Sequence, residues 1–129
     1  MSSADLTLPG LDRPVAPLGV GTWAWGDKNT WGMGGYDGSI TEATIAEAWE
    51  ASVDAGATFF DTAEVYGDGE SERIIGRLLA ADPARRDQAT IATKFMPAPW
   101  KLDARSALRA ALEASLERLG IDTVDLYQI

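Results

Sequence analysis

The chain has 129 residues, of which 46% are hydrophobic, a composition typical of one globular domain rather than of a disordered segment. Its formal net charge of −9 argues against nucleic acid or an anionic membrane surface as a partner. It contains neither cysteine nor histidine, so we expect no disulfide, no thiol chemistry and no zinc, copper or haem site.

The first part of the chain predicts a short structured lead-in, not a targeting segment. Residues 1–10 lack the basic start and the long apolar stretch of a secretory signal, and no apolar run reaches membrane-spanning length. Together with the absence of cysteine, this favours a soluble, cytoplasmic protein. Residues 6–18 alternate in polarity and are broken by glycine and proline, which predicts a small N-terminal hairpin over residues 1–18.

The next segment predicts a strand followed by a long loop. Residues 19–22 form a compact apolar element, the expected first parallel strand. Residues 23–38 carry five glycines and three tryptophans without any periodicity, which predicts a loop. Long ordered loops are more often functional than accidental.

Strand and helix signals then alternate to the end of the chain. Strands are expected over residues 58–61, 90–94 and 124–129. Helices are expected after a capping box at Ser39 and Glu42, over residues 70–80, and after a cap at Asp103. Gly56 and Gly120 are expected to end the first and last helices. The side chains expected to be buried are Ile45, Trp49, Ser52 and Val53, then Ile74, Ile75, Leu78 and Leu79, then Leu108, Ala111, Leu112, Ser115, Leu116 and Leu119.

This alternation predicts an α/β fold with about four parallel strands and three helices. No linker or low-complexity segment divides the chain. We therefore expect residues 1–129 to form one domain, with βα units over residues 19–129.

Three side chains suited to carbonyl chemistry lie at or just after expected strand ends. Asp61 and Lys94 end two strands, and Tyr66 follows Asp61 by five residues. Because parallel βα units bring the C-terminal ends of strands to one edge, these groups are expected to converge. A phenol has a pKa near 10, and a neighbouring ammonium favours its ionised form. A carboxylate would in turn keep that ammonium charged, so the set predicts a tyrosine that donates a proton while a hydride arrives.

Each of these residues also has a simpler interpretation when taken singly. A strand-end aspartate is often a helix cap or an ion-pair partner, a loop tyrosine is often a surface aromatic, and a strand-end lysine is often a solvated charge. The joint pattern is more specific. The segments FFDTAEVYG (59–67) and IATKF (91–95), with LGVGTWAWG (18–26) and DLYQI (125–129), resemble the aldo-keto reductase family over nearly the whole chain and in the family's order.

The resemblance implies a TIM (β/α)8 barrel, of which 129 residues supply about half. It implies NADPH-dependent reduction of aldehyde or ketone carbonyls, with Asp61, Tyr66 and Lys94 at three of the family's four catalytic positions. Similar members reduce aldehydes such as pyridoxal. The family's fourth member, a histidine, would follow Ile129, so the chain is expected to be a fragment that is at best weakly active alone.

The same resemblance implies how the cofactor would be held. Thr22 and Trp23 would lie beside the nicotinamide ribose, with Asp61 close to it, whereas the segments that grip the rest of NADPH (NADP+) belong to the second half of the barrel. NADH remains an alternative. Gly19, Gly21 and Ala24 also form G-x-G-x-x-A, but no helix opens at the third position, so we reject a Rossmann site.

Tryptophans gather in the loops after the first and third strands. They either fix these loops to the barrel or form an aromatic wall for a small carbonyl substrate, with Trp25 and Trp100 as the candidate contacts. Trp31 belongs to the same group, whereas Trp49 lies on an apolar helix face and is expected in the core. The two arginines of the loop at the opposite end of the sheet, Arg85 and Arg86, are expected in a solvated turn.

Two alternative functions are considered. A non-enzymatic scaffold or regulatory subunit would explain the missing histidine. A Schiff base at Lys94 is disfavoured because Asp61 would keep the amine protonated. Whatever its function, an incomplete barrel leaves strand edges unpaired. Self-association is therefore expected through these edges and through an inner face thought to include Val20, Phe60 and Ala92.

Overall fold

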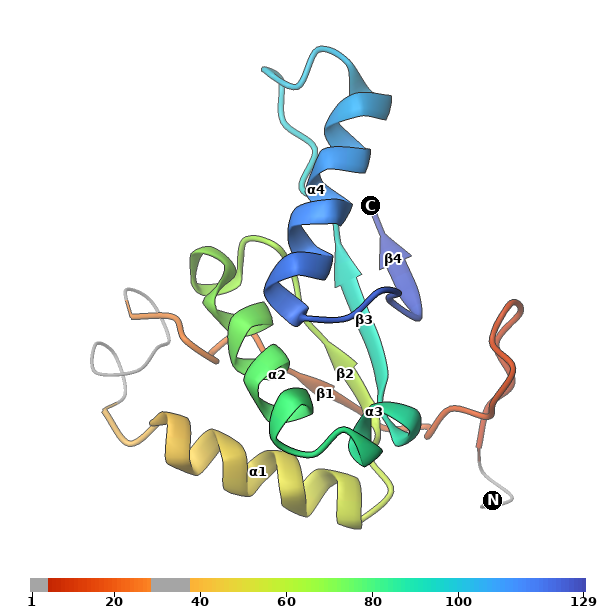
Figure 1. The fold of residues 1–129 in the computed structure, drawn as a ribbon, viewed down its shortest axis with the longest axis vertical. Helices are drawn as coiled ribbons and strands as arrows, with labels where there is room; N and C mark the ends of the chain where they lie inside the picture. Colours follow the sequence, from red (N-terminus) through yellow and green to blue (C-terminus); the bar gives the residue numbers. More distant parts are fainter. Residues whose placement is uncertain (1–4, 29–37) are drawn as a thin grey trace.

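The computed structural model describes residues 5–28 and 38–129. Four parallel strands form one sheet in the order β1-β2-β3-β4, as expected, and their helices lie along one face of it (Figure 1). The elements are β1 (Gly19–Gly21), α1 (Glu42–Asp54), β2 (Phe59–Asp61), the 3₁₀ turn η1 (Tyr66–Gly69), α2 (Glu70–Ala81), α3 (Ala84–Gln88), β3 (Thr90–Lys94), α4 (Ala104–Leu119) and β4 (Leu126–Gln128).

The N-terminal hairpin is confirmed by an antiparallel bridge between Leu6 and Val15. The two backbone amide groups donate to each other's carbonyl oxygens at 2.7 and 2.8 Å. Arg13 attaches the hairpin to the sheet, since its guanidinium donates to Ala89 O at 2.6 Å and to Asp125 Oδ1 at 2.9 Å. The lead-in is therefore anchored at the end of the sheet where β3 and β4 begin.

The hydrophobic core lies between the sheet and its helices. Val20, Phe60 and Ile91 are aligned across the first three strands and pack into this core, where the Phe60 ring stacks on Trp49 with centroids 4.2 Å apart. The expectation that Val20 and Phe60 face the inside of a barrel is therefore wrong. Because side chains alternate along a strand, Asp61 and Ala92 lie on the opposite face, hereafter the inner face.

Helix ends follow local capping chemistry. The first helix begins two residues later than expected: Thr41, not Ser39, is the N-cap, and Thr44 completes its capping box. Asp103 caps α4 as predicted, and Gly120 ends it with a left-handed φ of 65°. Only Ser115 and Leu119 of its expected stripe are buried, because the first half of α4 projects past the strand ends (Figure 1).

The short helix α3 was not expected from the sequence. It contains Arg85, which pairs with Glu50 and Asp54 of α1 at 3.0 and 2.9 Å. Arg86 donates to Asp125 Oδ2 at 3.1 Å and to the carbonyl oxygen of Thr123 at 2.8 Å. The predicted solvated turn is thus a helical turn whose arginines link it to α1 and to the segment before β4.

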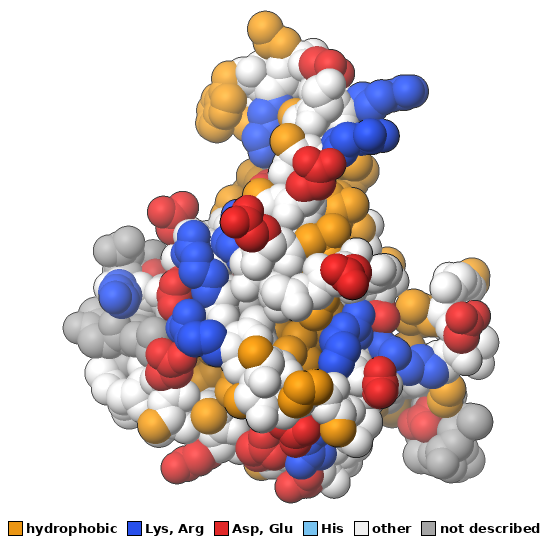
Figure 2. Space-filling view, viewed as in Figure 1, with side chains coloured by type: hydrophobic (Ala, Val, Ile, Leu, Met, Phe, Trp, Pro, Cys, Tyr) orange, Lys and Arg blue, Asp and Glu red, His pale blue; other side chains and the backbone are white. Residues whose placement is uncertain are grey.

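Charged side chains are spread over the face in Figure 2, and hydrophobic ones are visible both at the end formed by the loop before α4 and lower on the molecule. Trp100 and Leu102 of this loop are 78% and 94% exposed. Among the described residues, no helix is long and apolar enough to cross a membrane.

Candidate active site

An ion pair joins the ends of β2 and β3 on the inner face. Lys94 Nζ lies 3.0 Å from both carboxylate oxygens of Asp61 and donates to the carbonyl oxygen of Thr62 at 2.7 Å. Both side chains of the pair are about one-third exposed. The pairing register, which sets Asp61 beside Ala92, brings these two strand ends together. The ammonium therefore has a fixed position with oxygen acceptors on one side of it.

Tyr66 also lies close to this ammonium. It begins the turn η1, and Lys94 Nζ is 4.8 Å from the centroid of its ring. The expected convergence of Asp61, Tyr66 and Lys94 at the C-terminal edge of the sheet is thereby confirmed. Their chemical roles remain a prediction.

Trp23 connects the loop after β1 to this group. Its ring stacks on Tyr66 with centroids 6.2 Å apart and an interplanar angle of 25°. Trp23 is 55% exposed, so one side of the indole remains open beside the tyrosine.

Gln128 is a part of the site that the sequence analysis missed. Its side-chain amide nitrogen lies 3.3 Å from Asp61 Oδ1, and the register pairs it with Lys94. The sequence feature that could have identified Gln128 is its position at the end of the fourth strand, in line with Lys94. The carboxylate of Asp61 is therefore held by one side chain from β3 and one from β4.

Thr22 supports the backbone behind Asp61. It is fully buried, and its hydroxyl donates to the carbonyl oxygen of Asp61 at 2.9 Å. This hydroxyl has no exposed surface with which to make the expected contact to a nicotinamide ribose. Its hydrogen bond instead fixes the end of β2 to the end of β1.

The two candidate substrate contacts lie in different environments. Trp25 is only 7% exposed and belongs to the core, with its ring centroid 6.4 Å from that of Phe60. This burial does not fit a substrate contact. Trp100 is exposed and, with Met96, Pro99 and Lys101, lines a hollow of about 720 Å³ next to Val65. Trp31 lies outside the described residues.

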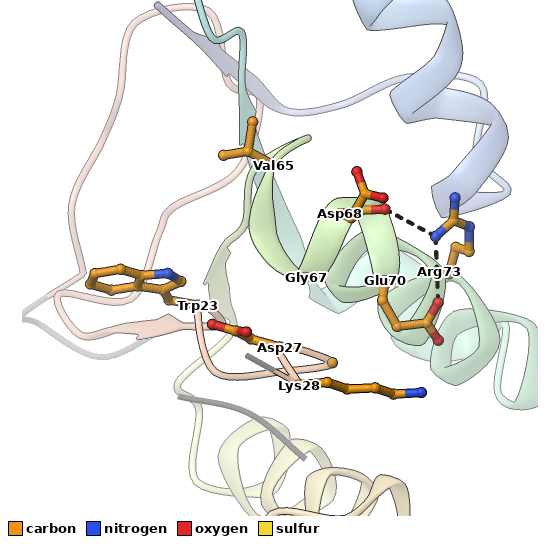
Figure 3. A pocket seen from close by; sticks show the side chains of 9 residues that line it. Trp23, Asp27, Lys28, Val65, Gly67, Asp68, Glu70 and Arg73 are labelled. Atoms are coloured by element: carbon orange, nitrogen blue, oxygen red, sulfur yellow. Dashed lines mark hydrogen bonds and ion pairs between the residues drawn. The ribbon is translucent and has the colours of Figure 1, made fainter. Parts of the chain in front are cut away.

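A second hollow, of about 560 Å³, lies between Trp23 and the start of α2 (Figure 3). Its wall includes η1, where Gly67, Asp68 and Gly69 all have left-handed backbones. A Cβ at Gly67 would lie 2.8 Å from backbone atoms of Gly26, so glycine is required for this close approach. Arg73 points toward Asp68 and Glu70 across the rim, where its guanidinium donates to the backbone carbonyl oxygen of Asp68 at 3.3 Å and pairs with the Glu70 carboxylate at 3.4 Å. The paired charges make this a polar hollow.

Two buried polar residues of α2, Ser71 and Glu72, were also missed. Glu72 is fully buried and accepts from the Thr93 hydroxyl and from Arg118 Nε, each at 2.6 Å. Ser71 is fully buried between Thr22 and Thr62. Polar residues in the first turn of a helix are usually solvated, so the sequence offered no signal for their burial.

Tyr127 lies near this network on the helix side of β4. Its hydroxyl is buried and has no hydrogen-bond partner among the described residues. Burial raises the pKa of Tyr127 to about 12, and the negative charges of Glu64 and Glu72 act in the same direction. The positive charge of Arg118 opposes them.

Within residues 5–28 and 38–129, no group of three or more His, Cys, Asp or Glu side chains could hold a metal ion.

Comparison with known proteins relates the whole arrangement to one family. The sequence model of the Aldo/keto reductase family matches residues 17–129. The chain is 35% identical to the chloroplastic pyridoxal reductase of Arabidopsis thaliana, covering 89% of this chain and 32% of that protein. It is 36% identical to a 6-dehydroglucose reductase of Novosphingobium aromaticivorans, covering 98% of this chain and 43% of that protein.

Solved structures give the same result. A glycerol dehydrogenase from Gluconobacter oxydans superposes with a TM-score of 0.74 and 36% identity, covering all of this chain and 39% of that one. An aldo-keto reductase from Klebsiella pneumoniae in complex with NADPH gives a TM-score of 0.69 and 30% identity, covering 92% of this chain and 36% of that one. The chain thus spans less than half the length of the proteins it matches.

Proposed function

Because this chain belongs to the aldo/keto reductase family, we propose that it supplies the proton-donating part of an NADPH-dependent reductase of aldehydes or ketones. The observation that carries the proposal is the position of Lys94 Nζ, 3.0 Å from Asp61 and 4.8 Å from the ring centroid of Tyr66. A phenol, a cation and a carboxylate in this order are the parts that proton transfer to a carbonyl oxygen requires.

In this mechanism Tyr66 donates its hydroxyl proton to the carbonyl oxygen of the substrate. The phenolate that forms lies next to the Lys94 ammonium, which stabilises its negative charge. Asp61 and the carbonyl oxygen of Thr62 hold that ammonium in place. NADPH, when bound, supplies the hydride for the carbonyl carbon. The product is an alcohol.

The residues around Asp61 fit a flat nicotinamide ring. Gly21 is paired with Asp61 in the register and so shares its face, and a Cβ added to Gly21 would meet no atom within 4 Å. The half-exposed ring of Trp23 borders the same region through its stacking on Tyr66. Trp23 and Asp61 are therefore the residues proposed to contact the nicotinamide end of the cofactor, over the backbone that Thr22 supports.

The proposed substrate is a small molecule with a carbonyl group. The exposed Trp100 and its apolar neighbours in the loop before α4 offer a wall for such a molecule. The relatives include reductases named after pyridoxal, 6-dehydroglucose and methylglyoxal. These three compounds share a carbonyl group and little other structure. The cytoplasm is the compartment that the sequence favours.

The test is made on the complete protein encoded by the gene, by following NADPH oxidation with a panel of aldehydes. Tyr66→Phe is expected to lower kcat by about 10²–10⁴-fold while the Kd for NADPH stays unchanged, because general acid catalysis acts in the transition state. Tyr127→Phe is the matched control, since this tyrosine lies on the helix side of the sheet. Unchanged turnover in Tyr66→Phe would refute the assignment of the acid.

A non-enzymatic scaffold or regulatory role is the second candidate. In that role the chain would keep the fold of the family without turnover. The same assay separates the two candidates. The isolated chain is expected to be at best weakly active, and a complete absence of turnover in the encoded protein would favour the scaffold.

A further inference from the structure

We propose that Ser71 is a positioning residue, which sets the backbone at residues 61–62 so that Asp61 and the Thr62 carbonyl group hold Lys94 beside Tyr66. This inference rests on the proposed function, since it concerns the ammonium to which that function assigns a role. Ser71 itself touches neither Lys94 nor Tyr66 in any described hydrogen bond.

The hydroxyl of Ser71 lies at the centre of a buried polar cluster. Its Oγ is 2.8 Å from Thr22 Oγ1, 2.9 Å from Thr62 Oγ1 and 3.1 Å from the carbonyl oxygen of Thr22. All three side chains are fully buried. The cluster therefore joins the first turn of α2 to the residues that directly follow β1 and β2.

The number of hydroxyl protons fixes the direction of the hydrogen bonds in the cluster. Thr22 donates its hydroxyl proton to the carbonyl oxygen of Asp61, so towards Ser71 it can only accept. Ser71 must then donate toward Thr22, and Thr62 must donate to Ser71. The single Ser71 proton is then shared between the hydroxyl oxygen and the carbonyl oxygen of Thr22. Removing the central hydroxyl would leave a buried donor on Thr62 and a buried acceptor on Thr22 without partners.

Both ends of this chain of hydrogen bonds reach residues of the candidate active site. At one end, the carbonyl oxygen of Asp61 accepts from both the backbone amide and the hydroxyl of Thr22, at 3.0 and 2.9 Å. At the other end, Thr62 presents its own carbonyl oxygen to Lys94 Nζ at 2.7 Å. The peptide segment that carries both acceptors of the ammonium is thus fixed through Ser71.

A buried serine can also serve packing alone, and Ser115 of α4 provides that comparison. It is fully buried as well, but among the described residues its hydroxyl accepts from Arg118 at 3.2 Å and makes no hydrogen bond to residues 61–62. Ser71→Ala and Ser115→Ala remove the same atom from equally buried sites. They therefore separate positioning of the ammonium from loss of a buried hydroxyl.

The experiment follows the ammonium protons of Lys94 by NMR in the ¹⁵N-lysine-labelled 129-residue chain. The chain has three lysines, Lys28, Lys94 and Lys101, so Lys94→Arg assigns the signal. An ammonium held by three oxygen contacts exchanges its protons with water slowly. Ser71→Ala is expected to speed this exchange by about tenfold, whereas Ser115→Ala leaves it unchanged. Thr62→Val, which keeps the Thr62 carbonyl and removes its hydroxyl, is the second variant, with a smaller change in the same direction.

Each outcome of this experiment either supports or overturns the proposed role of Ser71. Unchanged Lys94 exchange in a folded Ser71→Ala chain overturns the inference, as does an equal change in Ser115→Ala. If Ser71→Ala does not fold, Thr62→Val decides by the same criterion, and loss of the fold in both would also overturn it. A Lys94 signal that exchanges as fast as Lys28 in the unaltered chain would instead refute the Asp61–Lys94 pair, and with it the proposed function.

Discussion

At the scale of single residues, Tyr127 couples stability to pH. Its pKa is raised to about 12 in the folded chain, against about 10 when unfolded, because burial penalises the phenolate. The folded state therefore retains the proton that the unfolded state releases in this range. The contribution of Tyr127 is complete below about pH 10 and is lost as the pH rises towards 12.

We therefore expect the free energy of unfolding to fall more steeply between about pH 10 and 12 in the unaltered chain than in Tyr127→Phe. At neutral pH the variant is expected to be more stable by about 1 kcal/mol, because a buried hydroxyl without a described partner is removed. Urea unfolding at a series of pH values measures both. Parallel curves for the two proteins would contradict the assignment.

The buried carboxylate of Glu72 gives a second prediction at this scale. Glu72→Gln removes the charge that faces Arg118, leaving a guanidinium that is only 20% exposed without its partner. Breaking such a pair is expected to lower the free energy of unfolding by about 3 kcal/mol. Glu50→Gln, which breaks the exposed pair with Arg85, is the control and should cost at most about 1 kcal/mol. Equal losses in chemical unfolding would show that burial of Glu72 has no energetic importance.

At the scale of elements, the contact of α2 with α4 depends on a glycine. A Cβ at Gly76 would lie 2.6 Å from the carbonyl oxygen of Arg118 and 2.9 Å from that of Leu119. Both are backbone atoms at the end of α4 and cannot rotate away. Gly76 is thus a packing requirement in the middle of a helix.

Gly76→Ala is therefore expected to destabilise the chain by about 1–3 kcal/mol, although alanine is intrinsically the better helix former by about 1 kcal/mol. Thermal or urea unfolding gives the sign directly. Gly38→Ala serves as the control, since a Cβ there meets nothing within 4 Å. A gain in stability at Gly76 would mean that the two helices separate without cost.

At the scale of the whole molecule, the sheet has two open edges. In the described residues β1 pairs only with β2 and β4 only with β3. Apolar side chains are exposed next to these edges, among them Leu18, Leu126 and Ile129. Unpaired backbone groups beside apolar side chains are a template for pairing with another chain.

We predict that the isolated 129-residue chain self-associates, with a sedimentation mass that rises with concentration. Leu126→Lys, which introduces a charge on β4, is expected to reduce this association. Leu102→Lys is the matched control, because Leu102 is 94% exposed in the loop before α4 and belongs to neither edge strand. A stable monomer in the unaltered chain, or equal effects of the two variants, would contradict the prediction.

The sequence by itself determined the order of the strands and of the three longer helices, the parallel sheet and the meeting of Asp61, Tyr66 and Lys94. These follow from local periodicity, from capping residues and from the rule that parallel strands end at one edge. The tertiary structure alone decided which polar residues are buried. Ser71 and Glu72 lie in a first helical turn that faces strand ends, and Trp25 enters the core on the helix side. Burial of this kind depends on contacts between segments distant in sequence, such as Ser71 with Thr22, which no local pattern encodes.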